Sequence, residues 1–153
     1  MNWNEYMFNL VDAISLKSKD NSNKVGCVIV GDNYEILSTG FNGFPIDVEE
    51  KENRFERPLK YFYTEHAERN AIYLAARRGT PLTNSRIYLK WFPCAECARA
   101  IIQSGIKEIF IDGKSYNPDV ISERDKRWEE SFTQAKLMLL EANISIKIIK
   151  GEN

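Results

Sequence analysis

Hydrophobic and polar positions follow two different periods along this chain. Near the N-terminus, apolar residues recur at helical spacing and predict an amphipathic helix. Its apolar face comprises Met7, Leu10, Val11, Ile14 and Leu16. Residues 25–30 form the run VGCVIV, which is rich in β-branched residues and typical of a strand covered on both faces. The turn formers GDN follow, and residues 35–43 predict an antiparallel partner for that strand.

Helix and strand patterns alternate through the rest of the chain. Helices are predicted at 65–78, 94–104 and 127–142, and strands at 86–91, 107–112 and 144–149. Gly79 and Gly105 follow two of these helices, and glycine commonly adopts the left-handed conformation that ends a helix. The order α-β-β-α-β-α-β-α-β contains no repeat and no low-complexity linker. It predicts a single domain over residues 1–153, with three α/β/α layers around a mixed five-stranded sheet.

Two polar stretches interrupt this alternation. Residues 44–63 read FPIDVEEKENRFERPLKYFY, and residues 113–126 read GKSYNPDVISERDK. Loops of this length inside a compact domain are usually functional or partly mobile. Arg54, Arg57 and Lys60 could complete a phosphate pocket, but we expect them to be solvated, because charged loop residues are usually exposed.

Composition narrows the function classes. The chain has 153 residues, of which 43% are hydrophobic and 28% are charged, an ordinary globular balance. Its formal net charge of -1 provides no broad basic surface, so we expect no nucleic-acid partner. No apolar run approaches the roughly 20 residues of a membrane span, and the N-terminal stretch lacks the features of a secretory signal. With three cysteines a disulfide framework is not expected, and the pattern indicates a cytoplasmic protein.

The only histidine in the chain, His66, lies two residues before Glu68 at a predicted helix start. Cys94 and Cys97 lie at the next helix start, after a proline, and a strand separates the two motifs. The spacing of the cysteines places both sulfurs on one helix face, and a helix N-terminus favours the thiolate that ligates zinc. His66, Cys94 and Cys97 therefore predict a Zn²⁺ site. Three protein ligands leave a fourth position for water, as catalytic zinc requires.

Glu68 completes a catalytic interpretation. On a regular helix His66 and Glu68 are about half a turn apart, so both cannot point straight at one metal. If the helix begins near Thr64, His66 can bind the zinc and the carboxylate of Glu68 can lie next to the zinc-bound water. A carboxylate in that place takes a proton from the water and passes it to a leaving amine.

Two other interpretations of the cysteines are open. Cys27 could join the three ligands in a closed structural zinc site without catalysis. Cys27 lies within the VGCVIV run, however, where a buried free thiol is expected. A thioredoxin-like redox role for Cys94 and Cys97 leaves His66 and Glu68 unexplained.

The spacing H-x-E followed by P-C-x-x-C is the signature of zinc deaminases that act on nucleobases. Four stretches between about residues 18 and 109 resemble the deoxycytidylate deaminases of the cytidine deaminase superfamily. They are SKDNSNKVGCVIV, TGFNGFP, HAERNAI and PCAECARAIIQSGI. The two zinc motifs belong to the whole superfamily, whereas the SKD and NGFP stretches favour a nucleoside monophosphate as the substrate. Asn21 stands where the family has proline, which loosens that turn.

This resemblance implies the three-layer cytidine-deaminase-like fold and the hydrolysis of dCMP to dUMP with release of ammonia. It implies that the histidine and the two cysteines hold the zinc and that Glu68 is the general acid and base. It places Asn42 near the sugar and Lys19 near the phosphate of a small nucleotide substrate. Superfamily members usually form oligomers, so we expect a homo-oligomer.

Other functions are open at this point. Another deaminase of the superfamily would act on cytidine or deoxycytidine, on guanine or on a tRNA adenosine. A non-catalytic, zinc-stabilised binding module is a second alternative, and replacing Glu68 with glutamine separates it from an enzyme. Trp91, Tyr116 and Trp128 are candidates to stack on a base, and each could equally belong to the core.

Overall fold

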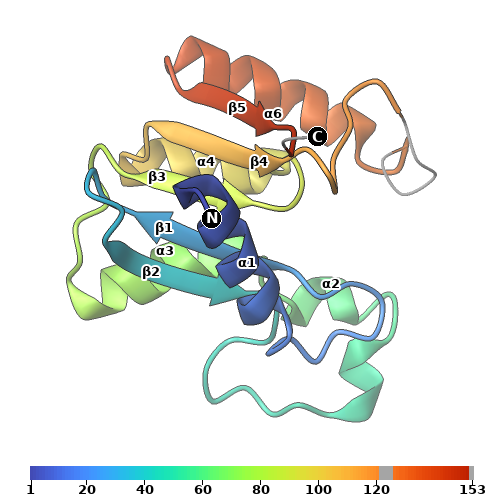
Figure 1. Ribbon diagram of the computed structural model, residues 1–153. Helices are drawn as coiled ribbons and strands as arrows, with labels where there is room; N and C mark the ends of the chain where they lie inside the picture. Colours follow the sequence, from blue (N-terminus) through green and yellow to red (C-terminus); the bar gives the residue numbers. More distant parts are fainter. Residues whose placement is uncertain (121–125, 152–153) are drawn as a thin grey trace.

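A five-stranded sheet forms the centre of the computed structural model, which describes residues 1–120 and 126–151 (Figure 1). Its strands are β1 (Gly26–Val30), β2 (Ile36–Phe41), β3 (Arg86–Leu89), β4 (Glu108–Asp112) and β5 (Ser145–Ile149). They lie in the order β2-β1-β3-β4-β5. Strand β1 pairs antiparallel with β2 and β3, whereas β3 with β4 and β4 with β5 are parallel. The predicted mixed sheet is confirmed.

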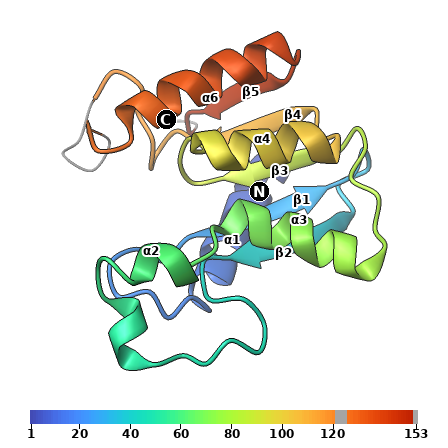
Figure 2. The ribbon, with the colours of Figure 1, turned by 180° about the vertical axis from the view of Figure 1, so that it is seen from behind.

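Helices cover both faces of this sheet. Helix α1 (Trp3–Ser15) lies on one face. Helices α3 (Ala67–Arg78), α4 (Ala95–Ser104) and α6 (Glu129–Glu141) lie side by side on the other face, as the view from behind in Figure 2 shows. The three α/β/α layers predicted from the order of the elements are therefore confirmed.

The position of strand β1 in the middle of the sheet explains why its sequence is a continuous apolar run. Val28 and Val30 belong to the hydrophobic cluster that includes Met7 of α1. Cys27 and Ile29 point to the opposite face and belong to the cluster beneath α3, α4 and α6. All five residues of the strand are buried, because side chains alternate between two faces that are both covered.

Helix α3 begins two residues later than the sequence predicts, and this is a correction. Its N-cap residue is His66, not Thr64. The reason is a short antiparallel bridge in which the backbone N–H groups and carbonyls of Gly43 and Glu65 bond to each other, at 3.1 and 2.8 Å. The bridge keeps residues 64 and 65 extended, so helical geometry starts only after His66.

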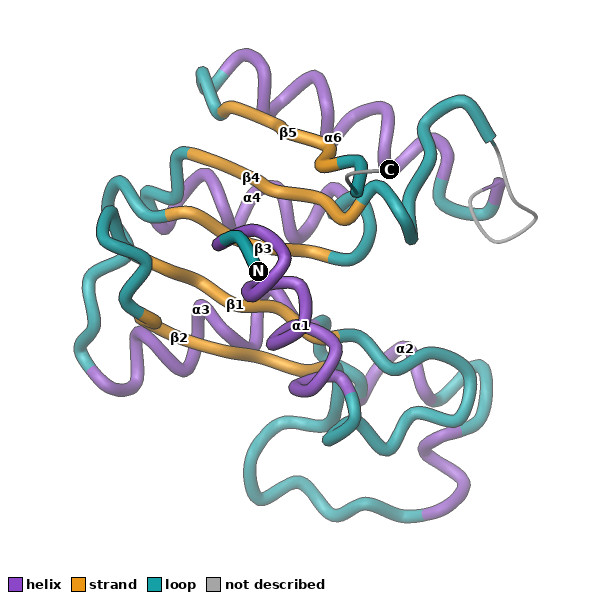
Figure 3. Tube along the Cα trace, in the orientation of Figure 1, coloured by secondary structure: helices purple, strands orange, loops and turns teal. Residues whose placement is uncertain are grey.

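The stretch 44–63 is not a plain loop as predicted, because it contains two short helices (Figure 3). These are the 3₁₀ helix η1 (Glu52–Phe55) and α2 (Lys60–Tyr63). Phe44 stacks on Phe55 with ring centroids 4.5 Å apart and also contacts Tyr63. One-turn helices leave no periodic pattern, so the sequence could not indicate them.

The second polar stretch, predicted as a loop at 113–126, includes residues 121–125, which lie outside the described residues. The helix predicted at 127–142 is observed as α6. Among the residues that the structure describes, no helix has the length and apolarity that a membrane span requires.

Candidate functional site

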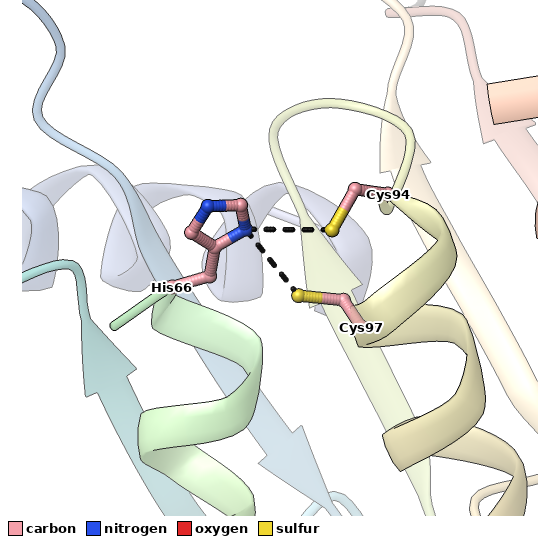
Figure 4. A group of neighbouring side chains, drawn as sticks. All are labelled: His66, Cys94 and Cys97. Carbon is pink, nitrogen blue, oxygen red and sulfur yellow. Dashed lines mark hydrogen bonds between the residues drawn. The ribbon is translucent and has the colours of Figure 1, made fainter. Parts of the chain in front are cut away.

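The N-termini of α3 and α4 bring three ligand-type side chains together. His66 is the N-cap residue of α3, and Cys94 is the N-cap residue of α4. Neither side chain forms a capping hydrogen bond with its own helix. Both side chains can therefore bind a ligand in the space between the two helices. Cys97 lies in the first turn of α4 and points to the same space (Figure 4).

The distances in this group match those of a metal site. Nδ1 of His66 lies 3.5 Å from Sγ of Cys94 and 3.5 Å from Sγ of Cys97. The three ligand atoms all lie within 4.8 Å of one another. A tetrahedral zinc ion with ordinary bond lengths separates a nitrogen from a sulfur ligand by about 3.6 Å. The group can therefore hold zinc without rearrangement.

The electrostatics of the group favour thiolate at Cys94, whereas the hydrogen bond with Cys94 and burial raise the pKa of the Cys97 thiol well above its ordinary value. A hydrogen bond from the Cys97 thiol lowers the pKa of Cys94 to about 3, and His66 adds to this effect. Nη1 of Arg69 also lies 3.7 Å from Sγ of Cys97, so a guanidinium faces the second sulfur. Arg69 is held in place by ion pairs with Glu65 and Glu96, the latter at 2.8 Å.

Glu68 lies in the first turn of α3, next to this group. Its side chain is buried, with an exposed fraction of 8%. Burial raises the pKa of the Glu68 carboxyl, although the nearby charge of His66 partly opposes the shift. A carboxyl with a raised pKa is suited to accept and return a proton near neutral pH. Glu68 is not among the residues whose ligand atoms form the metal-binding group.

A cavity of about 410 Å³ opens over these residues. Its walls come from α2, α3, the loop before α4 and the segment before α6, and its volume is in the range of small-molecule sites. Trp91 and Trp128 line it, and Trp128 meets the ring of His66 edge to face at 5.9 Å. Tyr116 does not line the cavity and packs against Phe92, at 5.9 Å between ring centroids.

Asn42 lines the cavity, and its side-chain amide is bonded to the backbone. It accepts from the N–H of Val25 at 2.8 Å and donates to the carbonyl of Asn23 at 2.8 Å. These bonds shape the wall between the SKD turn and β1. A contact of Asn42 with the substrate stays a prediction.

Lys19 is not among the cavity-lining residues. Its side chain is 67% exposed and pairs with Glu50 at the surface. The cavity is lined instead by Arg57 and Lys60. The expectation that these residues are solvated holds for Arg57, which is exposed, and is wrong for Lys60. Lys60 pairs with Asp20, at 2.8 Å, and both side chains are nearly buried. Sequence reasoning missed this pair because its partners are 40 residues apart.

Cys27 does not join the metal-binding group. It is fully buried, and its Sγ donates to the carbonyl of Ala67 at 3.2 Å. Burial raises the pKa of the Cys27 thiol well above its ordinary value. Cys27 therefore acts as a core residue, and within the described residues the closed four-ligand site is not formed.

Comparisons with known proteins agree with this geometry. The sequence profile described as the cytidine and deoxycytidylate deaminase zinc-binding region matches residues 1–112. An uncharacterized deaminase in the luxG 3′ region of Aliivibrio fischeri is 35% identical over 144 residues, which cover 94% of this chain and 91% of the relative. Deoxycytidylate deaminase of Homo sapiens is 35% identical over 128 residues, which cover 78% of this chain and 70% of the human protein.

A solved structure shares the fold. The dCMP deaminase of cyanophage S-TIM5, in complex with dCMP and dUMP, matches with a TM-score of 0.73 and 21% identity, over 97% of this chain and 99% of that chain. The profile match and the identity to the curated relatives go further than the fold. They show that this chain belongs to the cytidine and deoxycytidylate deaminase family and is a zinc-dependent deaminase.

Proposed function

We propose that this protein hydrolyses dCMP to dUMP and ammonia. The observation that carries the proposal is the meeting of a Cys₂His group and the buried Glu68 at one cavity of nucleotide size. Relatives named deoxycytidylate deaminase, such as the human and mouse proteins, support dCMP as the substrate. Water supplies the oxygen that replaces the amino group at C4 of cytosine, so the reaction needs no other reactant.

In this proposal His66, Cys94 and Cys97 hold the zinc ion. Two thiolates and one imidazole are a donor set that zinc prefers. Three protein ligands leave one coordination position open, as in other catalytic zinc sites. Bound zinc supplies one chemical effect, which is to lower the pKa of a water molecule to about 7.

Glu68 moves the protons. Its carboxylate accepts a proton from the attacking water, and the resulting carboxyl delivers a proton to the amino nitrogen on C4, which leaves as ammonia. The raised pKa of Glu68 fits this second role, because the protonated form must exist near neutral pH. The aromatic walls formed by Trp91 and Trp128 exclude water from the base and provide faces for it to stack on.

We also propose that residues 1–153 act as one deaminase domain, since α6 and β5 complete the core that supports α4. A homo-oligomeric state, a cytoplasmic location and the absence of a nucleic-acid partner stay predictions.

The test is ammonia release by the zinc-loaded protein with dCMP, CMP and deoxycytidine supplied separately. We expect fast turnover of dCMP. The variant Glu68→Gln should lose about 10²- to 10⁴-fold in kcat and keep its zinc and its thermal unfolding temperature. Full activity of that variant would refute the role of Glu68.

The same assay separates the alternatives. Equal rates with deoxycytidine and dCMP would indicate a nucleoside deaminase. Turnover of guanine or of a tRNA adenosine, with none of the cytosine substrates, would identify another branch of the superfamily. Zinc binding without any turnover, unchanged in Glu68→Gln, would identify a non-catalytic zinc module.

A further inference from the structure

The beginning of helix α6 contacts both segments that carry the metal-binding group. Ser131 and Phe132 follow Trp128 by three and four residues, so the three side chains lie on one face of the helix start. All three line the cavity. The ring of Trp128 meets the ring of His66 edge to face, with centroids 5.9 Å apart. The ring of Phe132 meets that of Phe92, in the loop before α4, at 6.1 Å.

The first turn of α4 needs a hydrogen-bond acceptor that its own N-cap residue does not supply. The first N–H groups of a helix have no partner within the helix, and a side-chain oxygen at the N-cap usually accepts from one of them. The N-cap residue of α4 is Cys94, which carries a sulfur in place of that oxygen and makes no capping hydrogen bond. Its sulfur faces His66 instead, with Nδ1 3.5 Å away. An acceptor for this end of α4 has to come from elsewhere in the fold.

Ser131 supplies such an acceptor from α6. Its Oγ accepts from the backbone N–H of Ala95 at 2.8 Å, although the two residues are 36 positions apart. Helices α4 and α6 lie side by side (Figure 2), and their buried residues, such as Ala98 and Leu139, belong to one hydrophobic cluster. The close packing of the two helices therefore holds Ser131 opposite Ala95.

The N–H that Ser131 binds is the one that controls the orientation of Cys94. Because a peptide unit is planar, the N–H of Ala95 lies in the plane that begins at the Cα atom of Cys94. Fixing this N–H fixes the ψ angle of Cys94, which is 169° and not helical. That angle sets the direction of the Cα–Cβ bond of Cys94 relative to α4, and with it the place of the sulfur.

We propose that Ser131 is a positioning residue that orients Cys94 toward the zinc ion, so that α6 sets the geometry of the metal centre. This inference rests on the proposed function, because it takes Cys94 as a zinc ligand. Ser131 acts through the peptide unit between Cys94 and Ala95, since that N–H is the group its Oγ binds. Helix α6 then contributes the direction of a metal–sulfur bond as well as part of the core.

The experiment replaces zinc with Co²⁺ in the full chain, because the absorption of Co²⁺ reports the geometry of its ligands. A thiolate ligand gives Co²⁺ a charge-transfer band, and a tetrahedral site gives intense visible bands. In Ser131→Ala the N–H of Ala95 loses its acceptor. We expect these bands to shift and the affinity for Zn²⁺ in chelator competition to fall about 10- to 100-fold. The kcat for dCMP should fall as well, with its KM unchanged, because Ser131 orients the metal and does not hold the substrate.

Two variants serve as controls. Ser131→Thr keeps the oxygen, so it should retain most of the affinity and the Co²⁺ spectrum of the parent protein. Thr133→Ala removes a hydroxyl from an exposed position of the same helix, outside the cavity, where it donates to the carbonyl of Glu129 at 2.9 Å. It should leave both the spectrum and the affinity unchanged.

Two results would overturn the positioning role. A role in stability alone would lower the unfolding temperature of metal-free Ser131→Ala and leave the Co²⁺ spectrum of the folded protein as in the parent. A contact with the substrate would raise the KM for dCMP, again with the parent spectrum.

Metal binding is measured without turnover, which keeps this inference separate from the proposed function. If the protein releases no ammonia from dCMP but Ser131→Ala shifts the Co²⁺ bands, the positioning role stands and the proposed reaction fails. If dCMP is deaminated and Ser131→Ala keeps the parent spectrum and affinity, the reaction stands and the positioning role fails. A parent protein without the charge-transfer band would refute Cys94 as a ligand, and both would fail.

Discussion

Replacing Gly40 with alanine should disturb both the stability of the fold and the metal centre. Gly40 lies on β2, opposite Cys27 on β1, and α3 crosses directly over it. A Cβ atom at this position would lie 2.2 Å from the carbonyl oxygen of Ala67 and 2.5 Å from the backbone nitrogen of Ala71. Both atoms belong to the backbone of α3, so no side chain can rotate away.

The size of the effect follows from these distances. Ordinary contacts begin near 3.4 Å, so α3 must move away from the sheet by roughly 1 Å. Overpacking of this kind costs about 1 to 3 kcal/mol, which for a chain of this length lowers Tm by roughly 2 to 12 °C. The shift also carries His66 and Glu68 away from α4, and a displacement of about 1 Å in a catalytic group can cost on the order of 10²-fold in rate.

The assay combines thermal unfolding, zinc retention against a chelator and ammonia release from dCMP. Gly43→Ala is the matched control, because its added Cβ would meet only the ring of Phe41 at 3.6 Å, an ordinary contact. We expect Gly40→Ala to unfold at lower temperature, to lose zinc more readily and to turn over more slowly, and Gly43→Ala to keep its Tm. Equal Tm and equal activity in the two variants would show that the approach of α3 to β2 does not position the site.

Two other predictions concern charged side chains around the cavity. Burial raises the pKa of Asp20, but the hydrogen bonds from Lys60 and the backbone outweigh it, so the pKa lies below its ordinary value of 3.8. The pair therefore stabilises the fold at neutral pH, and this contribution is lost as the pH falls through the lowered pKa. In urea unfolding, Asp20→Asn should cost about 1.5 to 3 kcal/mol at pH 7, with a smaller difference from the parent protein near pH 3; a difference independent of pH would contradict the assignment. Arg69→Met removes the donor that faces Cys97 and should weaken zinc binding about 10- to 100-fold in chelator competition, whereas unchanged affinity would show that Arg69 serves only its two ion pairs.

Local sequence patterns were sufficient for the elements and for the ligand set. The apolar run of β1 and the helical periods of α3 and α4 are visible without any structure, because each depends on residues close together in the chain. The motifs around His66 and Cys94 are informative for the same reason, since both lie at helix starts whose signals are local. The sequence predicts the start of α3 two residues too early, because the bridge between Gly43 and Glu65 joins residues that are 22 positions apart.

The charge pattern of the cavity depends on the tertiary structure alone. Lys19 and Lys60 are both basic residues in polar segments, and no local hydrophobic pattern predicts which of the two is buried. Folding pairs Lys19 with an exposed glutamate and buries Lys60 against Asp20 at the cavity wall. Arg57 borders the cavity and is exposed, as expected for a charged loop residue.

The sequence by itself determined which residues this protein can use for zinc chemistry and in what order helices and strands follow. Only the tertiary structure decided which charges are neutralised, how closely α3 approaches β2 at Gly40 and which side chains share the cavity with Glu68. The physical reason is the distance along the chain over which each kind of interaction acts. Helix and strand propensity act over a few residues, whereas ion pairing and close packing depend on distances between segments that are far apart in the chain.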